Sequence, residues 1–242
     1  IVGGTGVERD MIATPLSAMP EDLRPGLIVV TPYIAENNGF EYLAATDYNS
    51  DSVAIYDLVS FNADGYYNGF SDWEGILFHE IIHLAADSGK IDQAALGHLD
   101  SLARQEAFHA ADYLGNPYYE SGGAGGGASE ALPGWGESYI HTSEGTYQTA
   151  LRHYNESGCD IGIQMFSLIA QMFAHPSSDG SGELATYVFV QDPNSGAIHR
   201  TEVPLVEVTL SNGNTYLVPE SFDIENAEVF TPEFNSNDPI EV

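Results

Sequence analysis

The sequence predicts an α+β domain in which strands come first, helices follow and further strands close the fold. Three observations predict it. Short runs rich in β-branched and aromatic residues lie within residues 1–71 and again within 183–220, while residues 72–175 read mainly as helices. With 43% hydrophobic residues in 242, the chain can also bury a sizeable core. We therefore expect a single domain over residues 1–242 that ends in an acidic tail at 221–242.

The amino-terminal part carries three strand-like runs. They are Leu27–Thr31, Tyr42–Thr46 and Val53–Tyr56, and a turn-rich DYNSD stretch at 47–51 separates the last two. Two runs joined by a short turn are typical of a β-hairpin, so this pattern predicts a hairpin in the first part of the chain.

The central part reads as helices broken by glycine. A first helix is expected from Trp73 to about Ala86, and a second from about Asp92 to Leu114, where a Gly-Asn-Pro stop follows. Residues 121–136 are rich in glycine and predict a flexible lid or linker. Further helical stretches are expected at about 137–155 and 161–174.

The carboxyl-terminal part alternates between strand-like runs and turns. The runs TYVFVQ, AIHRTEV, LVEVTL and TYLVP lie between residues 186 and 219, with turn residues at 192–196 and 212–214. Short strands joined in order by tight turns predict an antiparallel β meander.

The string HEIIH at residues 79–83 carries the chemistry of this chain. On a helix, positions i and i+4 lie on one face, so His79 and His83 can present two imidazoles to one zinc ion. Glu80 projects about 100° away around the helix and can take a proton from a water molecule, which is the general-base role in this motif. The flanking residues are apolar on nearly every side, so the helix is expected to be buried. The alternative is a core helix whose histidines bond to backbone carbonyls.

Catalytic zinc normally has three protein ligands, so HEIIH needs a third. Glu106 is one candidate, because it faces the apolar side of the predicted second helix. Asp87, one turn beyond His83, is another, and it could instead orient His83. Asp100 also lies at the edge of the apolar stripe.

Further residues are candidates for neighbouring roles. Tyr139 and His141, beyond the glycine-rich segment, could stabilise an oxyanion, and so could His109. Each could equally be structural. Glu80 and His83, together with Glu106 and His109, also form two E-x-x-H elements, which are typical of di-iron carboxylate bundles. That alternative needs two more long helices.

The charge of the chain is strongly unbalanced. There are 36 acidic against 6 basic residues, giving a net charge of −30. This excludes nucleic acid as a partner and favours a cationic protein or peptide substrate. Salt or divalent cations screen such charge, which suggests a secreted protein in a saline or calcium-rich setting. An ordinary acidic cytosolic protein and a polyanion mimic are alternatives.

Other features bear on localisation. The single cysteine, Cys159, forbids an intrachain disulfide. No apolar run reaches 18 residues, so no membrane span is expected. The first residues lack the features of a signal peptide, and we expect the chain to be mature or exported without one. Residues 3–8 resemble one imperfect calcium-binding RTX repeat, which makes structural Ca²⁺ a second candidate ion.

Residues 72–115 resemble the zincin effector proteases of bacterial pathogens, of the NleC and NleD type, and related domains of exported RTX proteins. The resemblance rests on HEIIH, on Trp73 six residues before the first histidine, and on Gln105-Glu106-Ala107 followed by YLGNP at 113–117. It covers about a fifth of the chain. It implies a zincin-like fold, with a second helix that carries a ligand, and bacterial origin.

The resemblance also implies site residues. It assigns zinc to His79 and His83, and the general base to Glu80. The NleD type implies Glu106 as third ligand, whereas the NleC type points to Asp87 or Asp92. We therefore expect a zinc-dependent endopeptidase, secreted or delivered as an effector. The alternative of a different class is a non-catalytic acidic binding or structural protein. Substrate specificity and oligomeric state do not follow from the sequence.

Overall fold

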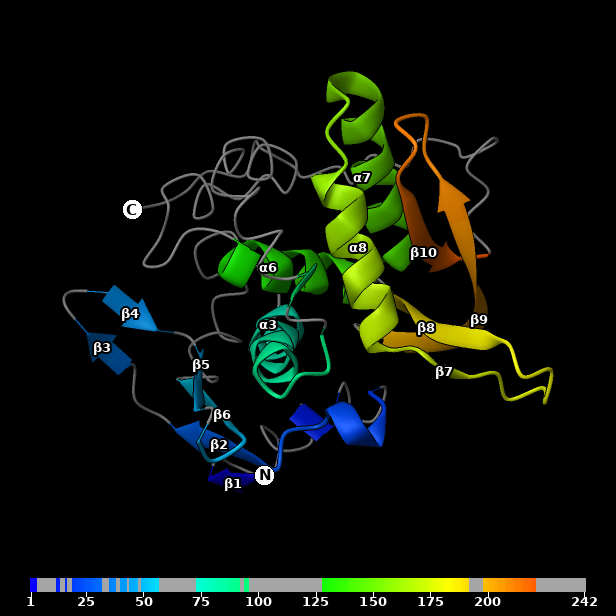
Figure 1. Ribbon diagram of the computed structural model, residues 1–242. Coiled ribbons are helices and arrows are strands. Elements are labelled where there is room, and N and C mark those ends of the chain that lie inside the picture. The colour runs from blue at the N-terminus through cyan, green and yellow to red at the C-terminus, as the bar shows by residue number, and fades with distance from the viewer. Residues whose placement is uncertain are drawn as a thin grey trace.

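The α+β prediction is confirmed. Figure 1, a computed structural model, shows one sheet at the lower left, a second at the right, and helices between them. The structure describes residues 1–3, 12–13, 16, 19–31, 35–37, 40–42, 44–47, 49–56, 73–91, 94–95, 128–191 and 198–220. Most of the predicted second helix at 92–114 lies outside the described residues, as do 121–127, the turn at 192–196 and the tail at 221–242.

The first sheet contains the predicted hairpin. Its order is β1-β2-β6-β5, where β5 pairs antiparallel with β6, and β1, β2 and β6 run parallel. Strand β5 lies at one edge. The bounds are β1 Val2–Gly3, β2 Leu27–Thr31, β5 Ala44–Asp47 and β6 Ser52–Tyr56, with a 3-10 turn at Glu21–Leu23 and a separate pair of strands, β3 Ala35–Asn37 and β4 Phe40–Tyr42. The prediction of one strand over Tyr42–Thr46 was wrong, because Tyr42 ends β4 and β5 begins at Ala44.

Helix α3, Trp73–Asp87, is the predicted HEIIH helix. Leu77, Phe78, Ile81 and Ile82 are buried. The helix packs against β5 and β6 of the first sheet and against helix α6. Apolar contacts on several sides explain why its sequence is apolar nearly all round.

Helix α6, Ala128–His141, corrects the prediction of a flexible lid or linker for residues 128–136, the part of 121–136 that the structure describes. One of its glycines packs closely on α3. A Cβ built on Gly136 would lie 1.7 Å from Cδ1 of Ile82, so a larger residue at this position would require the Ile82 side chain to move. Trp135, next to Gly136, is buried. Glycine content therefore did not predict the helix over residues 128–136.

The stretch expected as one helix at 137–155 is divided in two. Thr142 has extended backbone (φ −159°, ψ 97°), and its hydroxyl accepts a hydrogen bond from the N–H of Gly145. This N-cap ends α6 and begins α7, Ser143–Ser157. Helix α8, Ile161–Met172, agrees with the prediction for 161–174.

The predicted antiparallel meander is confirmed as the second sheet, in the order β10-β9-β8-β7. Its strands are β7 His175–Pro176, β8 Leu184–Gln191, β9 Ile198–Thr209 and β10 Thr215–Pro219. The runs AIHRTEV and LVEVTL form one strand, β9. No helix among the described residues is long and apolar enough to cross a membrane.

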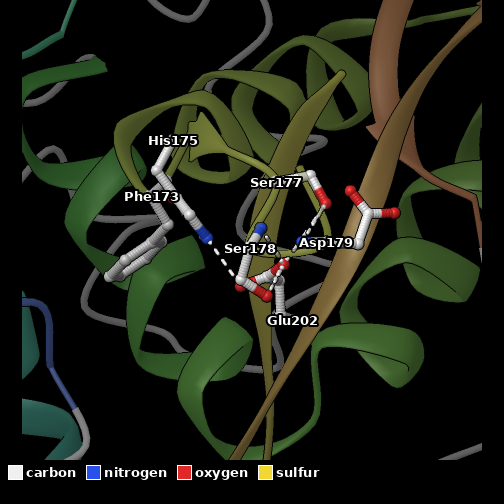
Figure 2. Close-up of polar contacts among 6 residues, drawn as sticks. All are labelled: Phe173, His175, Ser177, Ser178, Asp179 and Glu202. Atoms are coloured by element: carbon white, nitrogen blue, oxygen red, sulfur yellow. Dashed lines mark hydrogen bonds and ion pairs between the residues drawn. The ribbon is translucent and has the colours of Figure 1, made fainter. Parts of the chain in front are cut away.

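One carboxylate ties the turn after β7 to β9. Glu202 accepts hydrogen bonds from the backbone N–H and the hydroxyl of Ser178, each at 2.8 Å, and lies 3.1 Å from Nε2 of His175. Nδ1 of His175 lies 3.0 Å from the carbonyl oxygen of Phe173. Figure 2 shows these groups gathered around Glu202. These donors, the Ser178 N–H first, lower the pKa of Glu202 to about 2.

Candidate metal centre

His79 and His83 lie side by side on α3. Their ring centroids are 4.9 Å apart and the rings are inclined at 63°. Both side chains are partly buried. Since one helical turn separates them, the backbone itself sets this spacing, and the pair can present two imidazole nitrogens to a common ion.

Glu137 on α6 contacts the first of these histidines. Its Oε1 lies 2.6 Å from Nδ1 of His79, and the two side chains are 13% and 15% exposed. The close approach of α6 at Gly136, one residue earlier, brings this carboxylate to the HEIIH helix. A carboxylate accepts, so Nδ1 donates, and in the neutral ring the lone pair is then on Nε2. This is the tautomer in which Nε2 ligates a metal.

Glu80 is held by a residue of the first sheet. The hydroxyl of Thr46 on β5 donates to Oε2 of Glu80 at 2.6 Å, and it also lies 3.1 Å from the backbone oxygen of Glu80. A charge-assisted hydrogen bond of this length is a strong one. The carboxylate of the candidate base is thus oriented by the sheet.

The candidate third ligands are placed differently. Asp87 is exposed at the end of α3. It lines a cavity of about 290 Å³ together with Asp22, Arg24, Asp51 and Lys90, and neither histidine is in that lining. Glu106 lies outside the described residues, as do Asp92, Asp100 and His109.

The two candidates for oxyanion stabilisation lie on α6. Tyr139 is fully buried among Phe166, Phe173 and Phe189, and its hydroxyl donates to the carbonyl oxygen of Tyr187 at 2.9 Å. Burial raises the pKa of Tyr139 above its usual range. In this position Tyr139 supports the core. His141 is partly buried in the last turn of α6.

The donor types of the site suit zinc. Within the part of the chain that the structure describes, no group of three or more His, Cys, Asp or Glu side chains is arranged to hold a metal ion. The described residues supply two imidazoles and a carboxylate that engages one of them. Imidazole nitrogen is a preferred zinc ligand, and a carboxylate on its other nitrogen is a usual companion.

Sequence reasoning missed Glu137 and Thr46. Glu137 directly follows the segment that was expected to be a loop, and its approach to His79 depends on how α6 packs on α3. One signal was present, since a glycine that packs on the HEIIH helix stands next to Glu137. For Thr46, the signal was its place in a hairpin strand whose side chains alternate between the two faces.

Comparisons with known proteins add no evidence on the function of this site. No protein-family model, curated protein or solved structure matches the chain. The resemblance of residues 72–115 to zincin effector proteases therefore stays a prediction, and the side chains of the site carry the functional inference.

Proposed function

We propose that this protein is a zinc-dependent endopeptidase. The observation that carries the proposal is the arrangement around HEIIH: two histidines one turn apart, a carboxylate on Nδ1 of the first, and a glutamate between them held by a hydrogen bond. A core helix of purely structural role would require none of these placements together. The motif, the tautomer of His79 and the orientation of Glu80 all favour hydrolysis at a metal.

His79 and His83 would hold the ion, and a carboxylate would complete the ligand set. Glu106 is the ligand that the sequence favours, and Glu137 is the carboxylate nearest to His79 in the described structure. Zinc bound there would polarise the substrate carbonyl and acidify a water molecule.

Glu80 would then move the proton. In the hydrolysis, the oxygen of water bonds to the carbonyl carbon, and the C–N bond breaks. Glu80 accepts a proton from the water and delivers it to the leaving nitrogen, so that a carboxylic acid and an amine result. The hydrogen bond from Thr46 engages Oε2, which leaves Oε1 as the oxygen for this transfer.

An extended peptide suits the surroundings of Glu80. Among the described strands, β5 is the edge of the first sheet and carries Thr46, so a peptide added along this edge would lie beside Glu80. Edge strands present unpaired backbone groups that recruit extended chains. The net charge of −30 favours peptides with Lys or Arg.

The test combines metal content with peptide cleavage. We expect about one zinc per chain and cleavage of a peptide library or casein. Glu80→Gln should keep the zinc while losing activity by about 10²–10⁴-fold, because general-base catalysis contributes that much. Glu207→Gln, at an exposed position on β9, is the matched control and should retain full activity. A protein that binds zinc without cleaving peptides would be a structural metalloprotein, and one that binds no zinc would refute the proposal.

A further inference from the structure

The side chain of Thr46 reaches Glu80 from a different element of the fold. Its hydroxyl oxygen lies 2.6 Å from Oε2 and 3.1 Å from the backbone oxygen of Glu80. A hydroxyl has one proton to donate. The carboxylate is the charged and closer acceptor, so the proton goes to Oε2.

We infer that Thr46 is a positioning residue that holds Glu80 in the orientation needed for proton transfer. This inference rests on the proposed endopeptidase function. A glutamate side chain has several rotamers, and ordering it costs conformational entropy. The hydrogen bond from Thr46 favours one arrangement before substrate arrives, so less ordering remains for the reaction itself.

Thr46 is well anchored for this role. It pairs with Val53 of β6 in the hairpin, and β5 packs directly on α3. Asp47, the next residue, closes the hairpin turn by accepting hydrogen bonds from the N–H of Asn49 at 3.0 Å and the hydroxyl of Ser50 at 2.7 Å. Threonine is also branched at Cβ, which restricts its rotamers. The strand, the turn and the side chain itself thus limit where the hydroxyl can lie.

The kinetic experiment replaces the hydroxyl while keeping the shape. In the zinc-loaded protein, Thr46→Val should lower kcat by about 10- to 100-fold, the usual effect of a hydrogen bond to a charged group. KM and zinc content should stay unchanged. Thr46→Ser restores a hydroxyl and should recover most of kcat. Thr215→Val on β10, which removes an exposed hydroxyl paired with Thr209, is the matched control and should not change kcat.

A second experiment needs neither zinc nor substrate. In the metal-free protein, urea midpoints are measured for Thr46→Val, for Glu80→Ala and for the double variant. Residues that share a hydrogen bond give non-additive effects. We expect the double variant to lose clearly less stability than the sum of the two single losses. Additive losses would show that the two side chains do not interact.

The outcomes separate this inference from the function on which it rests. If the wild type cleaves peptides and Glu80→Gln does not, but Thr46→Val keeps full kcat, Thr46 has no positioning role and the endopeptidase stands. A fall in kcat that Thr46→Ser fails to restore would likewise overturn the inference, because packing would then be the cause. A wild type with zinc but no peptidase activity would overturn both.

Discussion

Two His–Glu pairs of this molecule have the same chemistry and different surroundings. On helices α3 and α6, Nδ1 of His79 lies 2.6 Å from Glu137, with side chains 13% and 15% exposed. In the second sheet, Nε2 of His175 lies 3.1 Å from Glu202, and each side chain is 25% exposed. The first pair is the shorter and the more buried, so solvent screens it less.

The difference lies in what the rest of each ring contacts. Both nitrogens of His175 face oxygen acceptors, the carbonyl of Phe173 and the carboxylate of Glu202, and its ring stacks on Tyr187 at 4.3 Å. These hydrogen bonds connect the turn after β7 to strand β9. In the other pair, Glu137 engages Nδ1 of His79, and His83 lies beside it on the same helix. A histidine that ligates a metal usually donates its other ring N–H to a carboxylate, so the pair with a second histidine beside it is the one that supports the proposed zinc site.

The largest expected difference between the two pairs concerns zinc itself. His79→Ala should abolish stoichiometric zinc binding, because it removes one of the two proposed imidazole ligands. His175→Ala is the matched variant and should retain about one zinc per chain. Zinc content measured by mass spectrometry after dialysis tests both. Equal zinc loss in the two variants would erase the functional distinction between the pairs.

The carboxylates should differ by a smaller factor. If Glu137 orients His79, Glu137→Ala should weaken zinc binding by about 10–100-fold, and Glu202→Ala should leave it unchanged. Titration against a chelator of known affinity measures this. Zinc binding by Glu106→Ala is measured in the same way, because Glu106 is the other candidate for the third ligand. If Glu137→Ala empties the site and Glu106→Ala does not, Glu137 is the third ligand, and the sequence-based choice of Glu106 is wrong.

The same comparison shows what could be read from the sequence. HEIIH and its apolar flanks predicted α3 closely, because helical periodicity and ligand spacing are both local properties. The hairpin and the meander were likewise predictable from alternation and turn residues. Each of these signals lies within a short window of residues.

The contacts of Glu137 and Thr46 were not predicted in this way. Their partners are 58 and 34 residues away in the chain, and the contacts depend on how α6 and β5 pack on α3. Composition was misleading as well. Glycine near residue 136 indicated a flexible lid, whereas Gly136 lies within helix α6 and packs closely against Ile82 of α3. Long-range packing is the part of the site that a single sequence does not encode in a readable pattern.

The smallest expected effect concerns pH and the second pair. Donation from the N–H and the hydroxyl of Ser178, and from His175, lowers the pKa of Glu202 from 4.5 to about 2 in the folded protein. A lowered pKa means that the carboxylate stabilises the fold fully above about pH 4.5, and that this contribution is lost as the pH falls toward 2. Glu202→Gln lacks the ionised group. The difference in urea midpoint between wild type and Glu202→Gln should therefore be largest at pH 6 and shrink by pH 3, while zinc binding at pH 7 is unchanged in the variant.

Glu207→Gln on the same strand removes one negative charge from a solvent-exposed position and controls for the relief of self-repulsion at net charge −30. A midpoint difference for Glu202→Gln that stays constant from pH 6 to pH 3 would show that the turn after β7 does not depend on this carboxylate, and the comparison would lose the structural role assigned to the His175–Glu202 pair.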